Sequence, residues 1–421
     1  MKNPFQNLFK KKDKVEEAVI PGGDKKKKTS FFGKYLKNRL GKSAVKGEEI
    51  VGVELTSTEI RLAQLISNKA NQWVLDRFFV HKFEGIDDTG TVLENPDKVA
   101  DELKLALQRS KISTTNAAIA IPVTSAIIRV VTAPLMTDEE LGKAIATDSL
   151  WENLVQLTDN LADYSIFHQV INRDSTANTM DILFVASKLS DINSYTDIIK
   201  KGGLNAVIID VKCFALKSAV DQVNQIAGSI EETNLTAVLE FGLDENYVMI
   251  IHNNIPIITD IFLRPQEKQH ILDVVSEQIP TEAEAVIRRY AMQIKQAITD
   301  YEAKYENKIT SIQVVSSLKN ILFLIPAFKK NLPTTGFVNF DPLQSVSVPS
   351  YNSEKVPNDN KSPIASVLGL AYRKLDIFGY YKFVTAVKNI NLLPNRESIR
   401  QSAKFKFLSG YALKGVAGAV A

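Results

Sequence analysis

The pattern of apolar and polar residues predicts alternating strands and helices from Ile50 onward. Three short apolar runs separated by polar turns come first, and they predict an antiparallel meander. A run with helical periodicity and two further strands follow. In order, these expected elements cover residues 50–58, 59–68, 72–83, 97–110, 116–122 and 126–134. Strands and helices that alternate in this way indicate an α/β protein.

The meander pattern occurs a second time, at residues 235–263. In each copy a glutamate and a polar turn stand at the end of the first strand, Glu54 in one and Glu240 in the other. A duplicated unit that opens with three strands, a helix and a strand resembles the ribonuclease-H-like fold of actin, Hsp70 and the sugar kinases. We therefore predict two lobes, the second at about 235–345.

Local signals mark other parts of the domain. Thr137 and Glu140 are spaced as a capping box, which predicts a helix that begins there. Residues 344–363 are rich in Ser, Pro and Asn, and this composition is typical of a linker. A helix is expected again at 362–375. Cys213 is the single cysteine, which excludes a disulfide framework and favours a reducing compartment.

Charge is distributed unevenly along the chain. Residues 1–47 carry 14 Lys and Arg against 4 Asp and Glu, a net charge of +10; since the total is +3, the remainder carries −7. We expect a disordered basic arm at 1–48, and such an arm suits anionic lipid, nucleic acid, an acidic partner or solvent alone. Residues 31–40 would form a basic amphipathic helix, either on a membrane surface or on the protein's own body. The first residues have no long apolar run, so no cleavable signal is expected.

Several phrases of the sequence carry a family resemblance. They are IVGVELTSTEIRLAQL from residue 50, NAAIAIPVTSAIIRVVTAP from 116, LTAVLEFG from 235 and the closing GLAYR at 369–373. In this order and spacing they resemble the PilM family of type IV pilus assembly proteins, which are actin-like and related to the division protein FtsA. The resemblance implies a PilM-type domain at 49–378, with a small subdomain inserted into the first lobe at about 135–210.

Residues 388–397, KNINLLPNRE, resemble the cytoplasmic N-terminal peptide of PilN, the inner-membrane partner of PilM. We call residues 390–394 the docking peptide; they are Ile390, Asn391, Leu392, Leu393 and Pro394, and a linker from 379 precedes them. An extended apolar peptide suits a groove. We expect both leucines and Pro394 in a groove of the first lobe within 120–210, Ile390 as an outer anchor and Asn391 setting the register. From the residues alone, a terminal loop that packs on its own domain stays open.

The chain after the docking peptide is basic and then apolar. The cations are Arg396, Arg400, Lys404 and Lys406, and an apolar run of small residues follows to 421. Basic residues before an apolar run are typical of the cytoplasmic flank of a membrane segment. The run is shorter than the ~20 residues that a span needs. We therefore expect 401–421 to be the start of a membrane segment or an interfacial anchor, with Arg396 and Arg400 facing lipid headgroups.

The family resemblance also implies where a nucleotide would bind. The matching positions are Glu54, Thr56 and Ser57 in the first phosphate motif, Glu240 and Gly242 in the second, and Ser316 and Ser317 in the adenosine motif. Three of these positions, Thr56 and the two serines, hold glycine in nucleotide-binding relatives, and a Cβ there obstructs close approach of the backbone. ATP and Mg²⁺ stay open as ligands of a degenerate site, and we expect little or no ATPase activity. The four histidines lack metal-ligand spacing, so no metal site is expected.

These observations favour a scaffold at the cytoplasmic face of the bacterial inner membrane. The expected partners are PilN/PilO-type membrane proteins, the pilus motor ATPase and the inner membrane, without nucleic acid; self-association stays open. The alternatives are a type II secretion component of the GspL kind, an FtsA-like membrane-tethered filament protein that binds ATP, and a kinase of the same superfold. The docking peptide distinguishes the first interpretation from the others.

Overall fold

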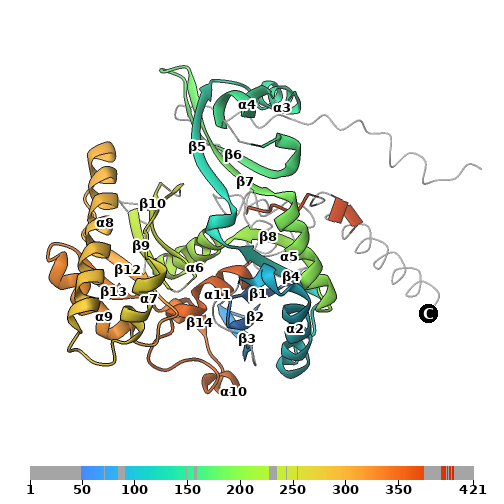
Figure 1. Cartoon of the computed structure of the whole chain (residues 1–421). Helices are drawn as coiled ribbons and strands as arrows, with labels where there is room; N and C mark the ends of the chain where they lie inside the picture. Colours follow the sequence, from blue (N-terminus) through green and yellow to red (C-terminus); the bar gives the residue numbers. More distant parts are fainter. Residues whose placement is uncertain are drawn as a thin grey trace, which may run out of the picture.

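The computed structural model describes residues 49–402, except 71, 84–90, 148, 156–158, 227–234, 243, 254, 374–389, 395, 397 and 400. Within this part of the chain two sheet-based lobes lie next to each other, and a small third sheet stands on the first lobe (Figure 1). The expected basic arm, the linker at 379–389 and the residues from 403 onward lie outside the described residues.

The first lobe is built on six strands: β1 (Val51–Leu55), β2 (Glu59–Ser67), β3 (Trp73–Lys82), β4 (Asn116–Ile121), β8 (Asn205–Val211) and β14 (Val346–Ser347). Their order in the sheet is β14-β3-β2-β1-β4-β8. β1, β2 and β3 pair antiparallel in sequence, which confirms the first predicted meander. β4 lies parallel to both β1 and β8, so β8 forms one edge of the sheet.

Helices cover both faces of this sheet. α2 (Pro96–Ser110) and α5 (Leu189–Lys201) pack together on one face, and α6 (Lys212–Ile226) and α11 (Ala365–Ala371) on the other. The contact between α11 and its neighbours is close. A Cβ at Gly369 would overlap the carbonyl of Ala215 on α6, and one at Gly52 would lie 2.5 Å from the carbonyl oxygen of Val367. These two glycines therefore allow α11 to pack against β1 and α6.

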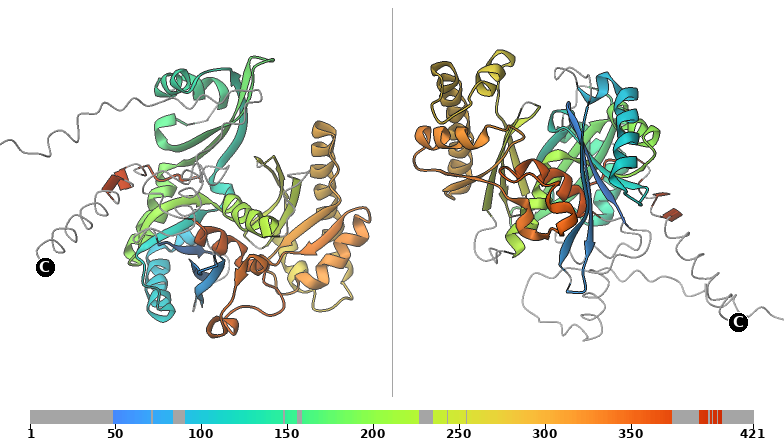
Figure 2. Two further views of the ribbon diagram at one scale, coloured as in Figure 1. Left: turned by 180° about the vertical axis from the view of Figure 1, so that it is seen from behind. Right: turned by 90° about the horizontal axis from the view of Figure 1, so that it is seen from below.

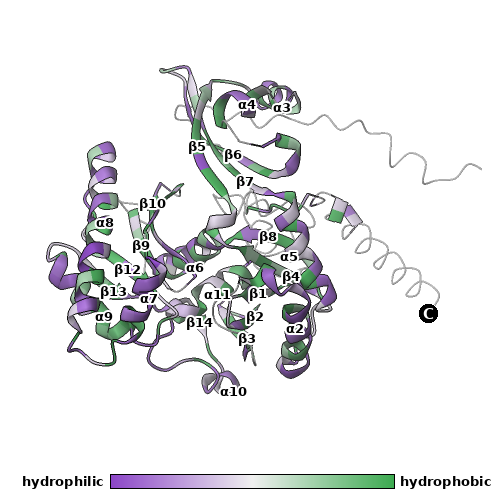
Figure 3. Ribbon diagram, in the orientation of Figure 1, coloured by the Kyte–Doolittle hydropathy of each residue, from purple (hydrophilic) through white to green (hydrophobic). Residues whose placement is uncertain are grey.

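The second lobe repeats the same plan. Its sheet has the order β11-β10-β9-β12-β13, and the helices α7 (Pro265–Leu272), α8 (Thr281–Tyr305) and α9 (Ile321–Asn331) pack against it. Its strands are β9 (Leu235–Phe241), β10 (Asn246–His252), β11 (Ile255–Asp260), β12 (Ser311–Val315) and β13 (Gly336–Asn339). β9, β10 and β11 form the second antiparallel meander. The predicted duplication is thereby confirmed, and Figure 3 shows apolar residues concentrated on the strands and the inward sides of the helices.

A small subdomain interrupts the first lobe between β4 and α5. It contains a sheet with the order β5-β7-β6 and the helices α3 (Asp138–Ala146) and α4 (Ser149–Val155), around a core of its own. The strands are β5 (Ile127–Pro134), β6 (Tyr164–Asp174) and β7 (Thr179–Lys188). Thr137 and Glu140 make the predicted capping box at the start of α3. Residues 205–210 of β8 lie inside the range 135–210 expected for this subdomain, but β8 pairs with β4 in the large sheet. Figure 2 shows the subdomain on the first lobe, apart from the helices of the second.

The stretch 344–363, expected as a linker, instead packs against the first lobe. β14 adds to the edge of the large sheet beside β3. α10 (Ser350–Ser353) follows, and the fully buried Asn352 donates from Nδ2 to the backbone oxygens of Leu75 at 2.7 Å and Asp76 at 3.1 Å. A polar composition suited a linker, but here the polar side chain satisfies buried backbone carbonyls.

Candidate functional site

The docking peptide lies along the free edge of β8. The backbone N–H of Leu392 donates to the carbonyl oxygen of Ile209 at 2.7 Å. From the other side, the hydroxyl of Ser165 on β6 donates to the carbonyl oxygen of Leu392 at 2.5 Å. Since β8 is the edge of the large sheet and β6 an edge of the small one, the peptide joins two sheet edges. The backbone of Leu392 is thus hydrogen-bonded on both sides, to the backbone of one sheet edge and to a side chain of the other.

The side chain of Asn391 completes the hydrogen bonds on the same edge. Its Nδ2 donates to the carbonyl oxygen of Val207 at 3.0 Å, and its Oδ1 accepts from the backbone N–H of Ile209 at 3.0 Å. The same Oδ1 accepts from the backbone N–H of Leu393, also at 3.0 Å. The amide thus substitutes for a strand backbone, and a shift of the peptide by one residue would break all of these contacts.

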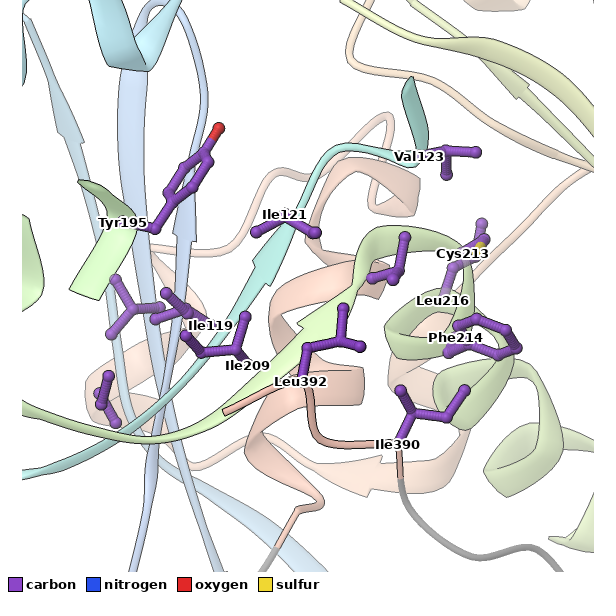
Figure 4. Packing of buried hydrophobic residues seen from close by; sticks show 14 of the residues in the cluster. Ile119, Ile121, Val123, Tyr195, Ile209, Cys213, Phe214, Leu216, Ile390 and Leu392 are labelled. Carbon is purple, nitrogen blue, oxygen red and sulfur yellow. The ribbon is translucent and has the colours of Figure 1, made fainter. Parts of the chain in front are cut away.

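Three apolar side chains of the peptide enter the main core. Ile390, Leu392 and Leu393 are 3%, 0% and 5% exposed, and they join the largest apolar cluster of the first lobe. Figure 4 shows Leu392 next to Ile209, and Ile390 near Phe214 of α6. Two expectations are wrong in detail. Ile390 is buried rather than an outer anchor, and Pro394 is exposed, because the chain turns away from the groove at that residue.

Arg396 also departs from its expected place at a lipid surface. It is half-buried, and its Nη1 donates to the carbonyl oxygens of Asn391 at 3.3 Å and Leu393 at 3.5 Å. The turn at Pro394, closed by a hydrogen bond from the N–H of Arg396 to the carbonyl of Leu393 at 3.3 Å, brings the guanidinium back onto the peptide. Arg400, Lys404 and Lys406 lie outside the described residues.

A buried ion pair supports the start of the peptide. Arg373 follows α11 and is 4% exposed; its Nη1 donates to Oδ2 of the fully buried Asp210 on β8. Its Nη2 donates to the carbonyl oxygen of Ile390. Burial raises the pKa of Asp210 to about 6, against the opposing attraction of Arg373. Sequence reasoning missed this pair, although an arginine closing one core helix and an aspartate within a buried strand are a usable signal.

The positions expected to hold a nucleotide meet at the junction of the two lobes. Glu54 near the end of β1 and Thr56 and Ser57 in the β1–β2 turn face the second lobe. Opposite them lie Glu240 near the end of β9 and Gly242 in the β9–β10 turn, around a cavity of about 50 Å³ that Ser317 also lines. The hydroxyl of Ser57 donates across the junction to Oδ1 of Asp244 at 2.8 Å. The hydroxyl of Thr56 closes its own turn by donating to the carbonyl oxygen of Glu59 at 2.9 Å.

Two cations of the chain stand among the carboxylates of this cavity. Arg61 contacts Glu54 at 3.0 Å and Glu59 at 2.6 Å. Lys212, at the start of α6 in the first lobe, contacts two carboxylates of the second lobe, Glu240 at 3.0 Å and Glu245 at 3.2 Å. Glu245 in turn accepts from the backbone N–H of Val123 at 2.5 Å.

The remaining nucleotide position is also closed. Ser316 is fully buried; its N–H donates to the hydroxyl of Ser362 at 3.0 Å, and its carbonyl oxygen accepts from Asn360 at 2.8 Å. A ligand of nucleotide size needs a pocket of roughly 300 Å³ or more. The hydrogen bond between the two turns, the paired cations and the small cavity leave no space for Mg·ATP in this arrangement. Oε1 of Glu54 and Oε2 of Glu240 are buried at this junction without a hydrogen-bond partner among the described residues.

The part of the chain that the structure describes shows neither a metal cluster nor a membrane span. No three His, Cys, Asp or Glu side chains there are placed to share a metal ion. No helix within the same part of the chain is long and apolar enough to cross a membrane.

Residues 52–306 match the family described as type IV pilus assembly protein PilM. A solved PilM–PilN type IV pilus biogenesis complex is similar with a TM-score of 0.62 at 14% identity, over 77% of this chain and 98% of that chain. The ethanolamine utilization protein EutJ from Carboxydothermus hydrogenoformans has a TM-score of 0.40 at 14% identity, over 79% of this chain and 92% of that one. No curated protein matches the sequence.

The family match includes the β1–β3 meander, the small subdomain, the docking edge β8 and the second lobe through α8. The two lobes with repeated meanders form an actin-like fold. The chain is a component of type IV pilus assembly, and it belongs to the PilM family.

Proposed function

We propose that the chain is a scaffold of the type IV pilus inner-membrane assembly complex, and that it works by binding the INLLP peptide at 390–394. The proposal rests on the contacts that the peptide makes along β8. Its backbone, its asparagine and three apolar side chains all have partners there. A loop that merely covered the domain would not need an amide placed to satisfy both the N–H of Ile209 and the carbonyl of Val207.

The solved complex that resembles this chain contains PilM and PilN. By analogy, the partners of this chain are PilN/PilO-type membrane proteins, and its place is the cytoplasmic face of the inner membrane. The scaffold would connect these proteins to the pilus motor ATPase. In this chain a PilN-like peptide is part of the same polypeptide, and it would therefore tie one tail to each domain.

Covalent connection favours docking within one molecule. Arg373 contacts the carbonyl of Ile390, so the two ends of the intervening segment 374–389 lie together. A segment of this length holds the peptide at an effective concentration of roughly millimolar near its groove. Even a weak peptide would then stay bound, and a free peptide would compete poorly until the tail is weakened.

The test is the double substitution Leu392→Ala and Leu393→Ala in the full chain. Each change removes a buried side chain, at a cost on the order of 2 kcal/mol or more. We expect the tail to be released, seen as rapid proteolysis within 374–389, and pilus assembly to be lost. A peptide of sequence 388–398 added in trans should bind the vacated groove.

The matched control is Pro394→Ala, which changes an exposed residue of the same peptide. It should leave both protease resistance and piliation unchanged. If the double variant stays protected and cells carry normal pili, the peptide is not the docking element.

A further inference from the structure

The residue at the end of α11 has two partners with different roles. Arg373 is held by Asp210, which belongs to the body of the domain, and it donates to Ile390, which belongs to the peptide. Both ionic side chains are almost completely buried, 3% exposed for Arg373 and 0% for Asp210. We propose that Arg373 is the positioning residue that recognises the peptide backbone at Ile390 and fixes where docking begins. This inference rests on the proposed function of the peptide.

Without the peptide, the guanidinium of Arg373 would lose one of its two acceptors. Asp210 would still accept the hydrogen bond from Nη1 of Arg373. Nη2 would have no acceptor, because the carbonyl oxygen of Ile390 would be absent. The Nε of Arg373 is already buried without a hydrogen-bond partner among the described residues. A buried charged donor that loses its acceptor is destabilising. The empty groove therefore presents a charged donor that a peptide carbonyl satisfies.

Arg373 contacts the backbone of the peptide, so this hydrogen bond depends on the register of the peptide and not on which side chain stands at position 390. Any residue at 390 offers a carbonyl, but only one register places it over Arg373 while the amide of Asn391 meets β8. Arg373 and Asn391 thus fix the peptide from two neighbouring positions. The ligand class is an extended peptide in which an apolar residue precedes Asn-Leu-Leu. The apolar side chain at 390 contributes burial, whereas its carbonyl sets the register.

A purely structural role is the alternative, because the ion pair also fastens the end of α11 to β8. Removing one partner cannot separate the two roles, since the other charge would remain buried and unpaired. Replacing both by apolar residues of similar size, Arg373→Met with Asp210→Leu, can keep the domain folded. That pair removes the donor to Ile390 without leaving a lone charge.

The experiment is a double-mutant cycle in which one change is made in the protein and the other in the peptide. The proteins are the full chain with Leu392→Ala and Leu393→Ala, whose groove is vacated, and the same chain with Arg373→Met and Asp210→Leu added. The ligands are the peptide 388–398 and its analogue with an ester in place of the amide between residues 390 and 391, whose carbonyl is a weaker acceptor. Loss of the N–H at 391 affects both proteins alike and cancels in the cycle.

We expect the added pair of substitutions to weaken binding of the amide peptide about 10-fold or more, with little change in Tm. The ester should weaken binding several-fold in the protein that retains Arg373 and not in the one that lacks it. Equal affinity of both proteins, or an equal ester effect in both, would overturn the role of Arg373. If the added pair unfolds the domain, Arg373→Lys replaces it, and the same ester comparison decides. Failure of the amide peptide to bind the vacated groove at all would instead refute the proposed function.

Discussion

Buried charged side chains cluster at the docking edge on β8 and at the junction of the two lobes, and the two clusters differ in the partners of their cations. At the docking edge, Arg373 has one partner in the domain and one in the peptide. At the lobe junction, Arg61 and Lys212 find all of their carboxylate partners within the two lobes. At the first place the peptide accepts one hydrogen bond of the guanidinium, whereas at the second both cations are paired within the domain. Oε1 of Glu54 and Oε2 of Glu240 are nevertheless buried at the second place without a hydrogen-bond partner among the described residues.

The largest effect should come from removing the cation that joins the lobes. Lys212→Ala leaves Glu240 and Glu245 as buried carboxylates without their cation, which destabilises by roughly 3–5 kcal/mol. Urea unfolding measures the change. The control is Lys201→Ala, which breaks an exposed ion pair with Asp97 and should have little effect. Equal stability of the two variants would show that Lys212 does not hold the junction.

The second prediction concerns pH. Burial raises the pKa of Glu240 from 4.5 to about 7, against the opposing attraction of Lys212. The folded state therefore keeps a proton between these values that the unfolded state has lost, so this group's contribution falls as pH rises from about 4.5 through 7. Glu240→Gln removes that titration. The difference in unfolding free energy between the variant and the wild type should shift in favour of the variant from pH 5 to pH 8. If the difference in unfolding free energy stays constant over this range, the pKa of Glu240 is not raised by burial in the folded state.

A smaller effect is expected at the hydrogen bond that bridges the two turns. Ser57→Ala removes the donor to the exposed Asp244 and should destabilise by about 1 kcal/mol or less. Thermal unfolding detects such a change. Ser190→Ala, which removes an exposed hydroxyl on α5, provides a comparison of the same chemistry away from the junction.

We expect the smallest effect on stability from the addition of a nucleotide. Because the cavity is small and its cations are paired, Mg·ATP should neither release measurable heat nor raise the Tm of the full chain. Calorimetric titration and thermal shift measure both quantities. A dissociation constant in the low micromolar range would show that the junction opens to admit a ligand, and the comparison between the two places would then fail.

Much of the fold was predictable from the sequence. The two meanders and the capping box at Thr137 follow from period-two alternation and local hydrogen bonding, which depend on neighbours in the chain. The stretch 344–363 was misjudged because its polar composition does not reveal that Asn352 meets the backbone of β3 far away in sequence.

The sites were predictable only in part. The residues of the docking peptide were expected in a groove of the first lobe within 120–210, and the sequence did not predict that this groove is the edge of β8. Which side chains are buried depends on the depth of the groove: Ile390 is buried and Pro394 is exposed, the reverse of the expectation. Arg396 suggested a membrane flank by its charge, whereas a local turn directs it to the peptide. Lys212 and Arg373 were missed because ion pairs between residues far apart in the chain leave no periodic pattern.

The central claim is that the docking peptide is bound along β8 in the full chain. Hydrogen exchange followed by mass spectrometry tests it directly at the backbone N–H of Leu392, which donates to Ile209. We predict strong protection of this N–H and of the N–H of Ile209 in the wild-type chain. Both should lose protection when Leu392 and Leu393 are replaced by Ala, while β1 and β4 stay protected. Exchange of the Leu392 N–H at the rate of an unstructured peptide in the wild-type chain would contradict the account.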